Sequence, residues 1–167
     1  MEYPIDGILL IDKLEGETSY GVVKRAKHVF TARTPLKVGH AGTLDPFATG
    51  LRIILLGQGT KLSQFLLAEG KEYMATMRLG VETDTFDPTG RVVRTGKVPH
   101  LTPDEIRSKA KAFIGNIEQV PPRFSAVKYG GTRAYKLARK GLDVGLRKRS
   151  VSVYSLQILS VQLPDVT

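Results

Sequence analysis

The sequence predicts an α+β fold with a mixed, largely antiparallel sheet and flanking helices. Short apolar or alternating segments of strand length recur along the chain. Stretches with helical spacing lie between them, without the regular strand–helix alternation of a doubly wound parallel sheet. With 167 residues and 41% apolar composition, the chain has the size of one domain with a real core. We therefore expect a single domain over residues 1–167.

The first third of the chain predicts two buried strands and two helices. Gly7–Ile11 and Leu51–Leu56 are short and apolar, as buried strands are, although Arg52 must reach a surface or a partner. Thr18-Ser19 supplies a helix cap, and Thr34-Pro35 ends the helix because the residue before a proline disfavours α geometry. The expected apolar face of this helix is Val22, Val23, Ala26, Val29 and Phe30, and a shorter stripe follows at Leu62, Phe65 and Leu66.

The remaining elements are predicted from alternation and from local turn and cap signals. Lys71–Leu79 and Val151–Leu163 alternate as half-exposed strands do. Asp87-Pro88-Thr89-Gly90 is typical of a type I turn, with Arg91–Arg94 as the returning strand. Thr102-Pro103-Asp104-Glu105 is a capping box with proline at the first helical position, so a helix is expected to begin there.

The positive charge is concentrated in one stretch. The formal net charge is +9, and Arg123–Arg149 contains nine Lys or Arg and one acid. The rest of the chain has sixteen basic and fifteen acidic residues. Phe124, Tyr129 and Tyr135 are interleaved with the cations, which suits unstacked bases. The pattern favours a polyanion, in particular RNA, over the alternative of a solvated basic face.

Several classes of function are disfavoured by composition. The chain has no cysteine, and its three histidines are scattered, so neither a disulfide framework nor a metal site is expected. No apolar stretch is long enough to span a bilayer, and the first residues lack the basic start of a secretory signal. We therefore expect a cytoplasmic protein that uses no metal and no membrane.

The stretch Gly39–Gly50 is the strongest candidate site. It holds a single carboxylate, Asp45, among small residues directly before a buried strand. Thr43, Thr49 and main-chain N–H groups are expected to orient this carboxylate in a pocket for a flat ligand. Alternatively, Asp45 and the proline after it form only a turn. Glycoside hydrolysis by a pair of carboxylates is disfavoured because no second acid lies near Asp45 in the sequence. The candidates for a second acid are Asp84 and Asp87, and the predicted turn accounts for Asp87.

The sequence Gly-His-Ala-Gly-Thr-Leu-Asp-Pro-Phe-Ala-Thr-Gly of residues 39–50 resembles the signature of the TruB family of tRNA pseudouridine synthases. The Lys-x-x-Gly-x-Thr-Ser segment of residues 13–19 is similar to the family's as well, with Leu14 where the family usually has proline. The likeness continues through shorter segments: Lys71–Ala75, Leu79-Gly80, Thr83–Thr85, Gln119–Pro122, Phe124–Ala126 and Lys136–Arg139.

This resemblance implies a pseudouridine synthase fold and a cofactor-free isomerase that modifies uridine 55 in the T loop of tRNA. Asp45 would be the catalytic residue, as a nucleophile at C1′ or as a base at the sugar. His40 would pack where the target base is displaced; otherwise it is a hydrogen-bonded loop histidine. Tyr73 would stack on the bound uracil; otherwise it is a strand aromatic facing the core. We expect a monomer at full length.

The resemblance also implies that residues 121–149 form a basic insertion that clamps the T arm of tRNA. The family continues past the position of Thr167 into a strand whose arginine pairs with the catalytic aspartate, so the C-terminal part of the family fold is expected to be absent from this sequence. The second hypothesis is a non-catalytic module that binds tRNA or aids its folding. The expected RNA-binding residues are Arg123, Lys128, Arg133, Lys136, Arg139 and Lys140.

Overall fold

The computed structural model describes residues 5–30, 35–125, 127–142 and 145–167, with the side chain of Lys128 also outside the description. Contacts divide the chain into two compact units, Met1–Glu72 and Tyr73–Thr167. Each unit is described by itself below. The α+β class predicted from the sequence is confirmed, because helices accompany strand pairs that are all antiparallel among the described residues.

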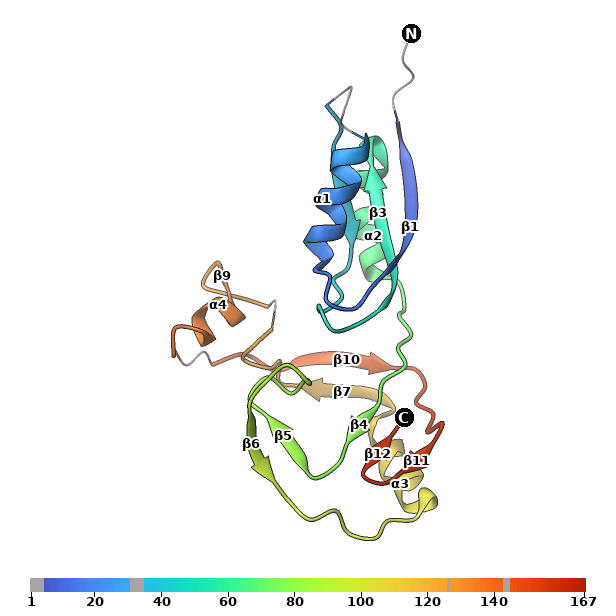
Figure 1. Cartoon of the computed structure of the whole chain (residues 1–167), viewed down its shortest axis with the longest axis vertical. Coiled ribbons are helices and arrows are strands. Elements are labelled where there is room, and N and C mark those ends of the chain that lie inside the picture. Colours follow the sequence, from blue (N-terminus) through green and yellow to red (C-terminus); the bar gives the residue numbers. More distant parts are fainter. Residues whose placement is uncertain (1–4, 31–34, 126, 143–144) are drawn as a thin grey trace. The chain divides into compact units, whose positions relative to one another are not determined.

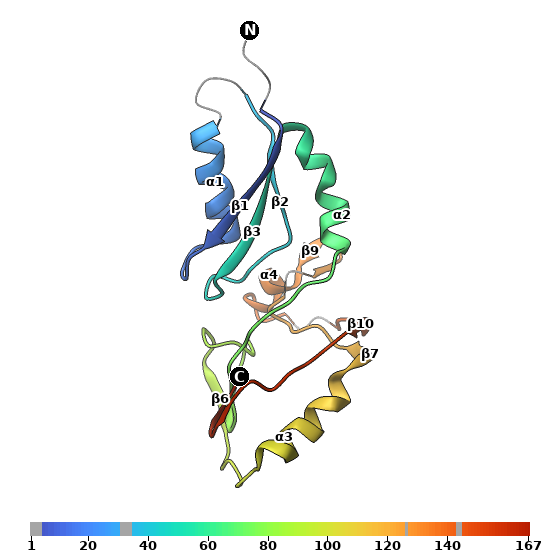
Figure 2. The ribbon, with the colours of Figure 1, turned by 90° about the vertical axis from the view of Figure 1, so that its right-hand side faces the viewer.

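The first unit is a three-stranded antiparallel sheet in the order β1-β3-β2, with β3 in the centre. Helix α1 lies on one face of this sheet and α2 on the other, as Figures 1 and 2 show. The elements are β1 (Gly7–Lys13), α1 (Ser19–Phe30), β2 (Val38–Ala41), β3 (Gly50–Leu56), the 3-10 helix η1 (Gly57–Leu62) and α2 (Ser63–Ala68).

The core of this unit lies between α1 and the sheet. The helix begins where predicted, since Thr18 Oγ1 accepts a hydrogen bond from Gly21 N at 2.9 Å. Val29, which was predicted to be on the apolar face, is 66% exposed because Phe30 is the residue of the last turn that packs against the core. The buried cluster consists of Val22, Val23, Ala26, Ile54 and Leu56.

The second unit contains several short antiparallel pairings instead of one continuous sheet. Strands β7 and β10 lie side by side (Figure 1), β12 joins β11 to β4, and the pairs β5-β6 and β8-β9 are hairpins. The elements are β4 (Met77–Arg78), β5 (Val81–Thr83), β6 (Val92–Thr95), α3 (Pro103–Ala110), the 3-10 helix η2 (Lys111–Phe113), β7 (Gly115–Gln119), β8 (Lys128–Tyr129), β9 (Thr132–Arg133), α4 (Ala134–Ala138), β10 (Arg149–Val153), β11 (Val161–Gln162) and β12 (Asp165–Val166).

Two strand predictions in this unit are wrong in extent. Of Lys71–Leu79 only Met77–Arg78 pairs, and Val151–Leu163 is divided between β10 and β11. An alternating pattern indicates that apolar and polar side chains would lie on opposite faces of a strand. A strand also needs a neighbouring strand to pair with its backbone N–H and C=O groups. Within the described part of the chain, the backbone between β10 and β11 has no such ladder partner.

The two local signals in this unit are confirmed. Thr102 and Glu105 form the predicted capping box at the start of α3, with Pro103 in its first turn. In the turn between β5 and β6, Asp87 Oδ1 accepts from Thr85 Oγ1 at 2.7 Å and from Thr89 N at 2.9 Å. Burial alone would raise the pKa of Asp87, but the hydrogen bonds from Thr89 and Thr85 together lower it. Asp87 is thus fully engaged in its turn.

Candidate functional site

The backbone that follows Asp45 is held by the segment after β1. Lys13 is completely buried, and its Nζ donates to the carbonyl oxygens of Leu14, Glu17 and Pro46 at 2.9, 2.8 and 3.1 Å. Three carbonyls satisfy the three N–H donors of an ammonium group. Gly16 N also donates to the Pro46 carbonyl, at 2.8 Å. The carbonyl of Pro46, the residue after Asp45, is therefore fixed by two donors.

The residue before Asp45 is held in a similar way by the first residue of α1. The buried Ser19 hydroxyl donates a hydrogen bond to the Leu44 carbonyl at 2.8 Å. The Ser19 hydroxyl oxygen also accepts a hydrogen bond from Leu44 N at 3.0 Å. Ala48 N donates to the Asp45 carbonyl at 3.1 Å and closes the turn. Both neighbours of Asp45 are thus anchored to the segment Lys13–Ser19. Sequence reasoning missed these anchors, although the Lys-x-x-Gly-x-Thr-Ser segment was the available signal.

The Asp45 side chain is exposed on this anchored backbone. The prediction that Thr43 and Thr49 orient its carboxylate is wrong, because neither hydroxyl bonds to it; no side-chain hydrogen bond or ion pair of Asp45 occurs within the described residues. Gly42 and Gly50, with φ of +85° and +110°, let the loop leave β2 and enter β3. The carboxylate is therefore held through the main chain and has no hydrogen-bond or ion-pair partner among the described residues.

His40 lies on β2 beside a buried cation of β3. Arg52 is 2% exposed, so of the two predicted possibilities, a surface or a partner, it has a partner, which is His40. Its Nη2 lies 2.5 Å from Nδ1 of His40, and its Nη1 is 3.5 Å from the Ala41 carbonyl oxygen. Arg52 Nε has no hydrogen-bond partner among the described residues. The same His40 Nδ1 is 2.6 Å from the Gly42 carbonyl oxygen.

The two contacts of His40 Nδ1 compete for one atom. A guanidinium only donates and a carbonyl only accepts, so Nδ1 forms one of these hydrogen bonds in each protonation state. A hydrogen bond to a charged group contributes about 1.5–3 kcal/mol, against about 0.5–1.5 kcal/mol between neutral groups. Arg52 has no other short hydrogen bond in the described structure. Of the two hydrogen bonds at His40 Nδ1, the one from Arg52 therefore contributes more than the one to Gly42. Burial, followed by the charge of Arg52, lowers the pKa of His40, and the weaker Gly42 hydrogen bond opposes this.

Tyr73 is the first residue of the second unit. It is 67% exposed and belongs to no strand, so the alternative that it is a strand aromatic facing the core is wrong. Asp45 and His40 belong to the first unit. That Tyr73 meets a base held at Asp45 stays a prediction.

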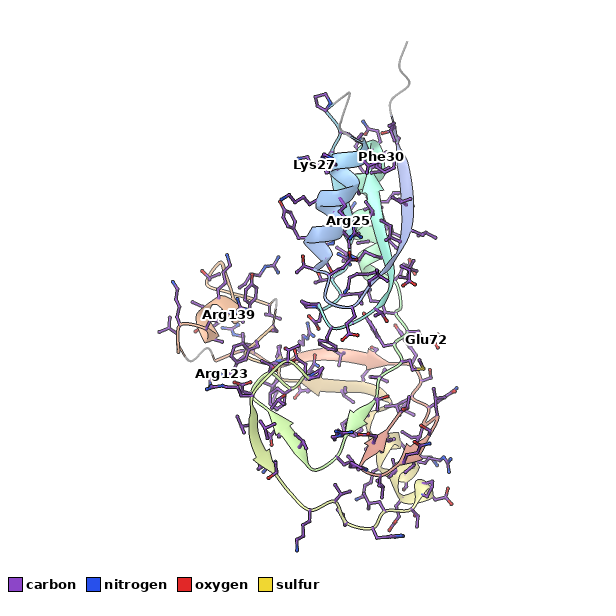
Figure 3. The ribbon with its side chains drawn as sticks, in the orientation of Figure 1. Arg25, Lys27, Phe30, Glu72, Arg123 and Arg139 are labelled. Carbon is purple, nitrogen blue, oxygen red and sulfur yellow. The ribbon has the colours of Figure 1, made fainter. Side chains whose placement is uncertain are left out.

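The predicted RNA-binding cations occur around the β8-β9 hairpin and α4 in the second unit. Arg139 stacks over the Tyr135 ring, with 5.6 Å from its guanidinium carbon to the ring centroid. Arg123 and Arg139 are labelled in Figure 3. The side chain of Lys128 lies outside the described residues. The exposed members of the set are Arg123, Arg133, Lys136, Arg139 and Lys140.

Two features are absent from the described part of the chain. No described helix is long and apolar enough to cross a membrane. No group of three or more His, Asp or Glu side chains that could hold a metal ion occurs in the same ranges.

Solved structures share this fold. A chain in the crystal structure of a Cbf5-Nop10-Gar1 complex matches with a TM-score of 0.67 and 33% identity, over 96% of this chain and 37% of that one. A chain in the structure of an H/ACA RNP bound to a substrate RNA containing 2′-deoxyuridine matches with a TM-score of 0.61 and 30% identity, over 96% and 35%. The fold is therefore that of the pseudouridine synthases, as the sequence predicted.

The family follows from the sequence comparison. Residues 27–167 match the model of the TruB family pseudouridylate synthase N-terminal domain, and the chain belongs to this family. The tRNA pseudouridine synthase B of Syntrophotalea carbinolica is 42% identical over 98% of this chain and 52% of its own length. That of Aquifex aeolicus is 49% identical over 93% and 53%. The chain spans about half the length of the curated relatives it matches.

Proposed function

We propose that the chain carries the catalytic aspartate of a tRNA pseudouridine synthase and converts uridine 55 of the T arm to pseudouridine. The observation that carries this proposal is the geometry of Asp45: an exposed carboxylate on a backbone anchored at both neighbours, Leu44 and Pro46. A group that must meet one atom of a displaced nucleotide needs a fixed position and an open side chain. Both conditions hold here.

The proposed reaction breaks the N1–C1′ bond of uridine, rotates the base and forms a C5–C1′ bond. The proton on C5 is released to solvent and N1 gains one, so the net change is an isomerisation. The Asp45 carboxylate acts either as the nucleophile at C1′ or as a base at the sugar. The exposed ring of Tyr73 stacks on the uracil, which offsets part of the cost of removing it from the RNA loop, since stacking on an aromatic contributes about 1–3 kcal/mol per base.

The test is a T-arm RNA hairpin that carries tritium at C5 of the target uridine. We expect the protein to release tritium into water in proportion to the pseudouridine formed, because C5 exchanges its hydrogen for the bond to C1′. Binding of the hairpin without tritium release would instead identify a non-catalytic RNA-binding module. Absence of both would contradict the proposal as a whole.

RNA binding is proposed to depend on residues 121–149, which we interpret as a basic insertion within one catalytic domain. Its exposed cations surround a hairpin and a short helix, and Tyr135 lies beneath Arg139. Such cations meet phosphates, and each phosphate contact releases a counterion from the RNA. Affinity should therefore fall steeply with salt.

Replacing the four cations Arg133, Lys136, Arg139 and Lys140 with alanine is expected to weaken RNA binding and flatten its salt dependence. The slope of log affinity against log salt should decrease by about 0.7 to 0.9 for each phosphate that the variant no longer binds. Fluorescence anisotropy at several salt concentrations measures this slope. The matched control removes four exposed cations around α3, namely Lys97, Arg107, Lys109 and Lys111. Equal slopes for the two variants would show that residues 121–149 form only a solvated basic face.

A further inference from the structure

Arg52 is a buried cation that the proposed reaction does not use. It lies on the central strand β3, and its side chain faces the same side of the sheet as Ile11, its register partner on β1. No acidic side chain pairs with it among the described residues. Burial lowers the pKa of the Arg52 guanidinium. Burying a cation without a carboxylate partner costs free energy, so packing alone does not explain an arginine at this position.

The contacts of Arg52 converge on the start of the Gly39–Gly50 loop. Its short hydrogen bond is to the ring of His40, and its longer one is to the carbonyl of Ala41. A Cβ added to Gly42 would lie 3.9 Å from Arg52 Nη1, so the guanidinium also borders Gly42. Arg52 thus touches three consecutive residues, of which His40 alone has a side chain that can exchange a proton.

We propose that Arg52 is a positioning residue, which holds the His40 ring with Nδ1 as a hydrogen-bond acceptor and leaves the ring proton on Nε2. The imidazole is then neutral, has one orientation and offers a donor at Nε2. This assignment resolves the competition at Nδ1 in favour of Arg52, and the Gly42 carbonyl is left to accept from solvent. If Arg52 is removed, Nδ1 becomes the protonated nitrogen and donates to Gly42.

The same contact explains how His40 avoids a positive charge. Among the described residues, Arg52 is the one charged side chain that lowers the pKa of His40, and burial lowers it more. The other titratable groups on the elements packed against β2 do not contribute. These groups are Tyr20, Lys24, Arg25, Lys27 and His28 on α1 and Lys61 on η1, and all are exposed.

The consequence for catalysis rests on the proposed function. A neutral ring of fixed orientation can occupy the place of a displaced base, whereas an imidazolium would have to be desolvated next to the guanidinium of Arg52. The tautomer itself is a property of the free protein. It is therefore measurable without RNA, and its outcome is independent of whether isomerisation occurs.

The test is nitrogen-15 NMR of the imidazole rings across a pH titration of the 167-residue chain. His28 and His100, which are exposed, serve as internal references. In the unmodified chain we expect the proton of neutral His40 on Nε2 and a titration midpoint below the ordinary value for histidine, because burial and the charge of Arg52 both lower the pKa. In Arg52→Met the proton should move to Nδ1, and the midpoint should shift upward because the neighbouring charge is gone.

The control Lys24→Met removes an exposed cation of the same unit without touching His40, and it should leave the His40 signals unchanged. A proton on Nδ1 in the unmodified chain would overturn the proposal. A folded Arg52→Met variant with an unchanged tautomer would overturn it as well. If Arg52→Met does not fold, the tautomer of the unmodified chain decides by itself, since Nε2–H supports the proposal and Nδ1–H refutes it.

Discussion

Replacing Asp45 with asparagine is expected to slow isomerisation at least about a thousandfold, equivalent to about 4 kcal/mol of transition-state stabilisation. Asparagine has the shape of aspartate, but its amide neither attacks C1′ as a carboxylate does nor accepts a proton at the sugar. The exposed Asp45 side chain makes no hydrogen bond within the described chain, so the change removes none. Single-turnover tritium release at saturating RNA measures the effect.

RNA affinity of the asparagine variant should remain close to that of the unmodified protein, because binding is distributed over many phosphate contacts. Glu15→Gln is the matched control: it neutralises another exposed carboxylate of the first unit, in the loop after β1. That variant should retain full turnover. Undiminished turnover with asparagine at position 45 would exclude Asp45 as the catalytic residue.

Strands β1 and β3 of the first unit could be predicted from sequence because each contains a continuous apolar run. Only β3 is largely buried, however: Ile8 and Leu10 on β1 are 48% and 64% exposed, so the prediction of a buried strand is wrong for one face of β1. Gly7–Ile11 and Leu51–Leu56 were located within two residues of β1 and β3. The alternating segment Lys71–Leu79 was not a strand over most of its length. Alternation is a property of one segment, whereas pairing depends on a second segment distant in sequence.

The same distinction applies to the candidate site. The motif identified Asp45 and His40, and an arginine inside an apolar run signalled that Arg52 needed a partner. Which partner it has depends on the register of two strands, since His40 pairs with Ile54, two residues from Arg52 on β3. No local pattern contains that register. The anchoring of Asp45 through Lys13 likewise joins residues 33 positions apart, Lys13 and Pro46.

The anchor at Lys13 leads to the second large expected effect. Lys13→Met keeps an unbranched side chain in the buried site but removes the ammonium, so the carbonyls of Leu14, Glu17 and Pro46 each lose a hydrogen bond. A buried polar group left without a partner costs about 1–3 kcal/mol. Pro46 retains the bond from Gly16 N, and the Leu14 carbonyl keeps a weak one from Glu17 N at 3.4 Å. We therefore expect a decrease of about 3 kcal/mol in the free energy of unfolding.

Denaturant unfolding of Lys13→Met measures this decrease, and hydrogen exchange localises it. The amides of Gly16 and Leu44, which bond to Pro46 and Ser19, should exchange faster because they report on the backbone at either side of Asp45. The exposed Lys24→Met should change stability by less than about 0.5 kcal/mol. Equal stability of the two variants would mean that water replaces the Lys13 ammonium without cost. In that case the position of Asp45 would depend on Ser19 and Gly16 alone, and isomerisation by Lys13→Met should match that of the unmodified protein.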